Sequence, residues 1–144
     1  MALLRILIVE DERIVGFDLR RRLCRMGHTV VGITASGEEA IAHAHRHRPD
    51  LVLMDVRLRG PMDGIEAAQH IWIQCQIPVV FMSGYTTVET LERIWRTVPS
   101  GYLSKPFFDD QLRMALERTL ETRMALKRKS ETRRRRKSRN RPHP

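Results

Sequence analysis

Side chains able to handle a phosphoryl group follow four of the five short apolar runs in the chain. Glu10 and Asp11 follow the first run, Asp55 the third, Ser83 the fourth and Lys105 the fifth. Three carboxylates brought together repel one another, and a hard divalent cation such as Mg²⁺ removes that conflict because it prefers oxygen ligands. A hydroxyl and an ammonium add partners for phosphoryl oxygens. The set therefore fits phosphoryl transfer, in which catalysis is mostly positioning and charge neutralisation.

Each of these residues taken alone has a more ordinary interpretation. A Glu-Asp pair after a strand is more often a solvated turn, and a Lys-Pro pair such as Lys105-Pro106 is more often part of a loop. The chemical hypothesis therefore depends on their joint placement, which requires that the apolar runs be neighbouring strands of one sheet.

The five apolar runs predict five buried strands. They cover residues 4–9, 30–34, 51–54, 78–82 and 101–104. Continuous apolar runs, in contrast to alternating ones, are typical of strands covered on both faces. Segments of helical period follow each run, so a βα unit is repeated five times. This order predicts an α/β fold, a doubly wound five-stranded parallel sheet with helices on both faces. Ligands bind such sheets at the carboxyl ends of the strands, where the candidate residues lie.

Local signals mark the expected helices. Ile14 and Phe17 are among the apolar residues assigned to the buried face of the first helix, which Gly27 is expected to end. Ser36 and Glu39 have the spacing of a capping box and predict the start of the second helix.

The histidine and tryptophan residues receive structural interpretations. His43 and His47 are four positions apart on a predicted helix, which allows a metal site, but no third ligand is evident and a solvated helix face is the better interpretation. Trp72 and Trp95 have apolar neighbours at helical spacing and are expected to pack in the core or at its edge.

Charge divides the chain into two parts. Residues 1–120 hold 15 Lys and Arg against 15 Asp and Glu, whereas residues 121–144 hold 11 against 2, a net charge of +9. We therefore predict a globular domain over residues 1–122 and a basic, disordered tail over 123–144, with the last helix extending to about residue 128. The tail suits nucleic acid, an anionic surface or an acidic partner, or it merely solubilises the chain. No Phe, Tyr or Trp follows Phe108, so the stacking typical of single-strand binders is absent.

No apolar stretch of the sequence reaches the length of a membrane span. The first apolar run is interrupted by Arg5 and lacks the cleavage region of a signal peptide. From the sequence we expect a soluble, cytoplasmic protein.

Four stretches of the chain carry a family resemblance. They are ILIVEDE at 6–12, LVLMDVRLRGPMDGIEAA at 51–68, PVVFMSGY at 78–85 and GYLSKPF at 101–107. With these motifs in order over residues 4–122, the chain resembles the receiver domains of bacterial two-component response regulators, in particular single-domain, chemotaxis-regulator-like members. The resemblance implies a flavodoxin-like sheet with strand order 2-1-3-4-5.

The resemblance also implies a metal site and a phosphoacceptor. Asp55 would be the phosphoacceptor. Mg²⁺ would be bound by Asp11, Asp55 and the backbone carbonyl of Arg57, with Glu10 acting through a water molecule. Many relatives have Asp where this chain has Glu10, so the metal geometry is expected to differ slightly.

The phosphoryl-binding and switch residues are implied in the same way. Ser83 and Lys105 would contact the phosphoryl group, and Gly84 would leave room for it. Ser83 and Tyr102 would form the switch that reshapes the surface of the fourth helix, fifth strand and fifth helix. The Lys105–Pro106 peptide bond is expected to be cis.

By this resemblance the protein is a phosphoprotein that acts as a signalling switch. A sensor histidine kinase would phosphorylate it, and a downstream protein of unknown identity would recognise the changed surface. A role as a phosphorelay intermediate, a homodimer, and regulation through nucleic acid or an anionic surface bound by the tail stay open. Slow autodephosphorylation is expected, and turnover catalysis is not. A phosphatase of the haloacid-dehalogenase type would need a second Asp at position 57, where this chain has Arg57.

Overall fold

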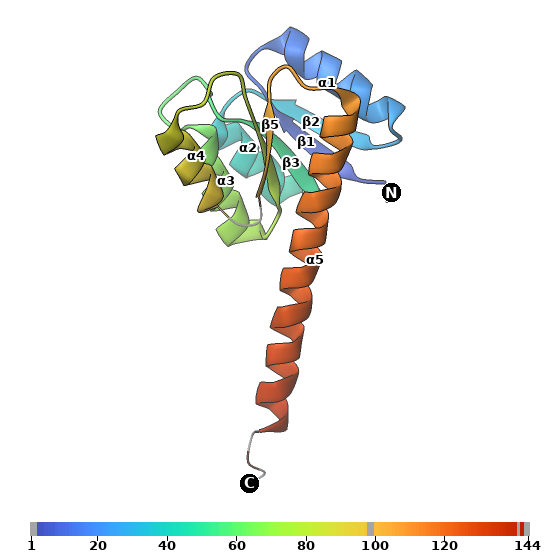
Figure 1. Ribbon diagram of the computed structural model, residues 1–144, viewed down its shortest axis with the longest axis vertical. Coiled ribbons are helices and arrows are strands. Elements are labelled where there is room, and N and C mark those ends of the chain that lie inside the picture. The colour runs from blue at the N-terminus through green and yellow to red at the C-terminus, as the bar shows by residue number, and fades with distance from the viewer. Residues whose placement is uncertain (1–2, 98–99, 141, 143–144) are drawn as a thin grey trace.

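Five βα units form the chain in the computed structural model, which describes residues 3–97, 100–140 and 142. Figure 1 shows a central sheet flanked by helices, with the last helix projecting far beyond it. In chain order the elements are β1 (Arg5–Val9), α1 (Arg13–Arg25), β2 (Thr29–Thr34), α2 (Gly37–His47), β3 (Leu51–Asp55), α3 (Gly64–Cys75), β4 (Val79–Ser83), α4 (Val88–Trp95), β5 (Ser100–Ser104) and α5 (Asp109–Arg139). The five predicted strands are confirmed, with ends that differ by one residue or none.

The sheet is parallel throughout and has the order β2-β1-β3-β4-β5. The predicted fold class and strand order are therefore confirmed. Val9 lies opposite Met54, and Asp55 lies opposite Met82, so the carboxyl ends of β1, β3 and β4 come side by side. This register places the residues that follow each strand at one edge of the sheet.

Each face of the sheet carries its own apolar core. Successive strand residues point to opposite faces, so Leu7 and Val9 of β1 join the core that includes residues of α2, α3 and α4. Ile6 and Ile8 join the core on the side of α1 and α5. The four side chains are fully buried, and burying each stabilises the fold by about 1.5–3 kcal/mol. Burial on both faces explains why β1 reads as a continuous apolar run.

The helix ends follow the predicted signals with one difference. Gly27 follows α1 with a φ of +95°, a conformation that glycine adopts without strain. The Ser36 hydroxyl accepts a hydrogen bond from the Glu39 N–H at 3.2 Å. The Glu39 carboxylate accepts from the Ala35 N–H, one residue before the position expected of a capping box.

Two expectations about apolar helix residues were wrong. The side chains of Ile14 and Phe17 are 85% and 58% exposed, because the buried stripe of α1 is formed by Leu19 and Leu23. Helical residues are about 100° apart, so Phe17 points about 160° away from Leu19. Trp95 at the end of α4 is also exposed, at 63%.

The structure also differs from the expectation of a disordered basic tail. Helix α5 has 31 residues and continues to Arg139, beyond the predicted end near residue 128. Neither Gly nor Pro occurs within it, and Ala, Leu, Met, Lys, Arg and Glu favour a helix even without tertiary contacts. None of the described helices combines the length and apolar character needed to cross a membrane. The boundary at residue 122 stays a prediction.

Candidate functional site

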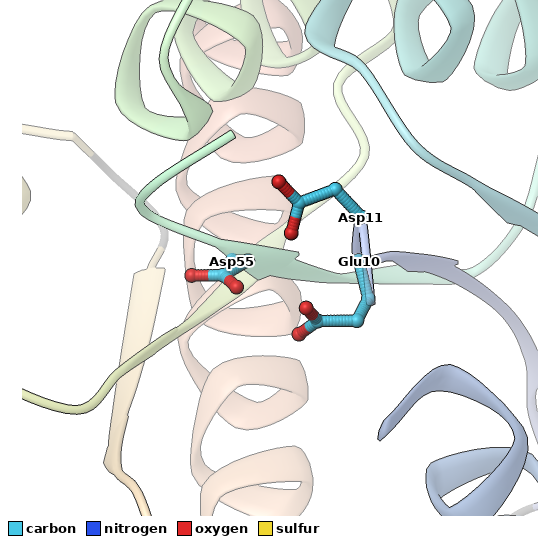
Figure 2. A group of neighbouring side chains, drawn as sticks. All are labelled: Glu10, Asp11 and Asp55. Carbon is cyan, nitrogen blue, oxygen red and sulfur yellow. The ribbon is translucent and has the colours of Figure 1, made fainter. Parts of the chain in front are cut away.

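Three carboxylates meet at the carboxyl edge of the sheet. Glu10 and Asp11 follow β1, and Asp55 ends the neighbouring strand β3. One oxygen of each lies within 4.8 Å of the others, and Figure 2 shows the three side chains converging on a common space. Oxygen ligands from adjacent strands at this spacing fit the preferences of Mg²⁺. Within the part of the chain that the structure describes, this is the one group of three ligating side chains.

Lys105 holds two of these carboxylates together. Its Nζ donates to Glu10 Oε2 at 2.9 Å and to Asp55 Oδ2 at 3.0 Å. The Glu10 side chain is almost completely buried, so its charge needs a partner. The Lys105 ammonium supplies that partner and also binds Asp55.

The pKa values of this pair follow from burial and pairing. Burial raises the pKa of Glu10, and the nearby charge of Asp55 raises it further, against the opposing effect of Lys105. Burial alone would lower the pKa of Lys105, but its hydrogen bonds to Glu10 and Asp55 outweigh that effect and the pKa is raised. Lys105 therefore carries its positive charge at neutral pH.

Backbone groups fix the orientation of the acids. The Arg57 N–H donates to Asp55 Oδ1 at 3.1 Å, and the Glu12 N–H donates to Glu10 Oε1 at 3.2 Å. The sequence did not point to Gly64, which begins α3 and whose N–H donates to the Val56 carbonyl at 2.9 Å. A Cβ at Gly64 would overlap the backbone carbonyl oxygen of Asp55. Only a glycine lets the helix approach the strand end so closely.

Of the three acids of the site, Asp11 has the side chain most exposed to solvent. Its nearest cation is Arg59, whose Nε is 3.6 Å from Asp11 Oδ2 and whose side chain is 87% exposed. An exposed pair of this kind contributes little stability. The Asp11 carboxylate is therefore open to a metal ion arriving from solvent.

The hydroxyls of Ser83, at the end of β4, and Tyr102, in β5, bond to groups other than the three carboxylates. The buried Ser83 hydroxyl donates to the Tyr85 carbonyl at 3.2 Å. The Tyr102 hydroxyl and Thr86 Oγ1 are 2.6 Å apart, which ties β5 to the segment after β4. Gly84 faces open space, with no atom within 4 Å of where a Cβ would lie.

The Lys105–Pro106 peptide bond is cis, the geometry that the family resemblance implied. The Lys105 N–H donates to the Ser83 carbonyl at 2.8 Å, so the loop after β5 continues the register of β4 and β5. This contact brings the Lys105 side chain to the acids.

A second pair of charges borders the site. Asp63 caps α3 by accepting from the Glu66 N–H at 2.9 Å, and its other oxygen accepts from Arg93 of α4 at 2.9 Å. A cleft of about 390 Å³ lies between this pair, Arg57 and Ser83. The sequence analysis missed Arg93, because no spacing rule connects it to Asp63. Both Arg57 and Arg93 line this cleft, together with the carboxylate of Asp63.

The two histidines on α2 do not form a comparable site. The rings of His43 and His47 are 4.3 Å apart, and no described acid or cysteine joins them in a group of three ligands. His43 instead packs on Gly32 of β2, where a Cβ would strike its imidazole.

Comparisons with known proteins agree with this geometry. The family model of the response regulator receiver domain matches residues 6–117. The transcriptional regulatory protein PdtaR of Mycobacterium tuberculosis is 37% identical over 113 residues, which is 78% of this chain and 55% of that protein. The phyllosphere-induced regulator PhyR of Methylorubrum extorquens is 32% identical over 103 residues, 71% of this chain and 38% of that protein. The chain thus spans about half the length of these curated relatives, or less.

Solved structures are similar in the same region. The signal receiver domain of a modulated diguanylate cyclase from Desulfovibrio desulfuricans has a TM-score of 0.80 and 37% identity, covering 86% of this chain and 98% of that chain. The chemotaxis protein CheY4 of Vibrio cholerae has a TM-score of 0.73 and 27% identity, covering 82% of this chain and 99% of that chain.

Proposed function

The chain belongs to the response regulator receiver family, the phosphorylation-controlled domains of two-component signalling, and we propose that its phosphoacceptor is Asp55. The observation that carries this proposal is the grouping of Asp55 with Glu10 and Asp11 within 4.8 Å, beside an ammonium 3.0 Å from Asp55. Receiver domains signal and are generally not turnover enzymes, which fits a site with one acceptor carboxylate and no second general acid/base at Arg57.

The donor would be the phosphohistidine of a sensor kinase. An Asp55 carboxylate oxygen attacks phosphorus, an oxygen–phosphorus bond forms, and the phosphorus–nitrogen bond to the kinase histidine breaks. The electron pair leaves with the imidazole, which takes up a proton. Asp11, Asp55 and the Arg57 carbonyl would hold Mg²⁺, with Glu10 acting through water, and the ion would neutralise the phosphoryl oxygens. Lys105 is placed to pair with the product.

Switching would exchange hydrogen bonds that the structure describes. The aspartyl phosphate adds strong acceptor oxygens. The Ser83 hydroxyl would leave the Tyr85 carbonyl for one of them, and Tyr102 would leave Thr86 and turn inward. The surface formed by α4, β5 and α5 then changes its affinity for a downstream protein, a homodimer partner or the next member of a phosphorelay.

The test is phosphorylation by acetyl phosphate, followed by intact mass. Wild-type protein with Mg²⁺ should gain one phosphoryl group, and chelation of Mg²⁺ should prevent the gain. Asp55→Asn should gain none, whereas Asp18→Asn, a matched change at an exposed acid of α1, should behave as wild type. Equal labelling of the Asp55→Asn variant would overturn the assignment of the acceptor.

A further inference from the structure

The far end of α5 forms an isolated, strongly cationic helix. We call residues 123–139 the basic arm; they contain 10 Lys and Arg and a single acid, Glu131. Every side chain of the basic arm is exposed except Arg123, which is partly covered. Figure 1 shows the arm leaving the body with no other element beside it. Because residues 1–120 have no net charge, the positive potential of the protein is concentrated on the arm.

We propose that the basic arm binds the phosphate backbone of double-stranded DNA, with the helix in the major groove and with little preference for sequence. Phosphate contacts by Lys and Arg release counterions, so a dense cationic segment binds nucleic acid without reading bases. This inference does not depend on phosphorylation of Asp55, so either can fail without the other.

The length and thickness of the arm fit B-form DNA. Its 17 residues rise about 25 Å along the helix axis, most of one DNA turn of about 34 Å. The B-DNA major groove is about 12 Å wide and admits an α-helix, while the major groove of A-form RNA is deep and narrow. A helix already formed also avoids the ordering cost that a disordered tail would incur on binding.

The part of the arm beyond Leu126 has no apolar side chains, and this favours DNA over a membrane. From Lys127 to Arg139 every described residue is Lys, Arg, Ser, Thr or Glu, and the cations occupy all sides of the helix. An interfacial helix inserts an apolar face between lipids, and this segment has none. Stacking with single strands is excluded as a mechanism for the arm, because it contains no aromatic side chain.

Bound phosphates would also relieve charge repulsion within the helix of the arm. Lys129 and Arg133, Arg133 and Lys137, and Arg135 and Arg139 are like-charged pairs four positions apart, and such pairs destabilise a helix. Phosphates that neutralise them remove this repulsion. At its other end α5 is anchored by the buried Leu112 and Leu116, so bound DNA would be held at a fixed orientation to the body.

The test is fluorescence anisotropy of a labelled 24-base-pair DNA duplex with the full chain, over a series of salt concentrations. The test variant replaces four arginines of the arm: Arg133→Gln, Arg134→Gln, Arg135→Gln and Arg136→Gln. The matched control replaces four exposed arginines of the body: Arg13→Gln, Arg20→Gln, Arg21→Gln and Arg46→Gln. A third variant replaces the same four arm arginines by Lys and keeps the charge.

We expect the Gln variant of the arm to bind DNA at least about tenfold more weakly at 0.1 M salt. The negative slope of log K against log salt should become shallower by about 2 to 4, because fewer counterions are released. The body variant should change neither quantity by as much, and the Lys variant should retain binding. Circular dichroism checks that each variant is folded.

Three results would overturn the proposal. One is equal loss of DNA binding in the arm and body variants, since binding would then follow net charge alone. Another is tighter binding of a double-stranded RNA of the same length and sequence than of the DNA duplex. That result would contradict the placement of the arm in the major groove of B-form DNA. The third is binding to vesicles of phosphatidylcholine and phosphatidylserine without binding to the DNA duplex.

Discussion

The two halves of α5 form the same helix for different reasons. In the first half, Leu112, Leu116 and Thr119 are buried against the sheet. In the second half, nothing described beyond Leu120 is buried, and the helix is maintained by residues of high intrinsic propensity. Packing usually supplies most of the stability of a helix in a protein, so the second half should be the weaker one. One element thus joins a region fixed by burial to a region governed by charge.

Residue patterns are informative where burial acts on the chain. Burial imposes a period on apolar residues, and that period is visible in the sequence of the first half. The second half has no such period because nothing covers it, and its helical state depends on the sum of many small preferences. Perturbations should therefore affect the packed body and the charged second half of α5 differently, as four experiments can test.

The largest difference is expected from matched leucine truncations. Leu116 is fully buried, so Leu116→Ala should lower the free energy of unfolding by about 2–5 kcal/mol. Leu126 is 37% exposed, and Leu126→Ala should change it by less than about 0.5 kcal/mol. Urea denaturation followed by tryptophan fluorescence measures both. Similar losses in the two variants would mean that the second half is also packed against a partner.

A smaller loss is expected where the body is packed tightly around the candidate site. Gly64→Ala places a methyl group against the Asp55 carbonyl and should cost about 1–3 kcal/mol, because α3 must move away. Gly84→Ala faces open space and should leave the unfolding free energy within about 0.5 kcal/mol of wild type. If the two variants unfold at the same urea concentration, the close approach of α3 to β3 is not a constraint.

The difference between buried and exposed regions explains which parts of the fold could be predicted from the sequence. The buried strands were found because burial on both faces leaves continuous apolar runs such as Leu51–Met54. Exposure of Ile14 and Phe17 was missed, because an apolar residue carries no sign of which direction its side chain faces. Disorder of the tail was expected because high charge was given more weight than the absence of Gly and Pro.

The candidate site was predicted only as far as strand ends determine it. The sequence predicted that Glu10, Asp11, Asp55 and Lys105 lie at one edge of the sheet, because the carboxyl ends of parallel strands meet there. It did not predict that Ser83 donates to the Tyr85 carbonyl or that Arg93 pairs with Asp63. These contacts depend on loop conformation and on the position of α4, which no local spacing encodes.

A third experiment compares the body and the basic arm by the pH dependence of the free energy of unfolding. Buried His28 accepts a hydrogen bond from the Leu4 N–H at 3.1 Å, and burial lowers its pKa from about 6.5. Below that value the unfolded chain binds a proton that the folded chain resists, so stability should be complete above pH 6.5 and fall as the pH decreases. Urea denaturation at pH 7.5 and 5.5 should show a smaller decrease for His28→Gln than for wild type. An equal decrease would assign the effect to other groups.

Apart from Arg123, the side chains of the basic arm are exposed to solvent rather than packed against the body. Variants that remove arm charges should therefore leave the pH dependence of body stability unchanged. This control uses the Gln variant of Arg133–Arg136 at the same two pH values, and a changed pH dependence would show that the arm and the body are energetically coupled.

The smallest effect concerns the single acid of the basic arm. Glu131 lies four positions from Lys127 and Arg135, and each such pair stabilises a helix by about 0.2–0.5 kcal/mol. Glu131→Gln should therefore reduce the helix content at low salt, seen as a less negative ellipticity at 222 nm. In 0.5 M NaCl the variant and the wild type should be equally helical, because salt screens both ion pairs. Glu121→Gln is the matched control, since Glu121 has no cation four positions away. A decrease that persists in high salt would show that Glu131 does not act through these two ion pairs.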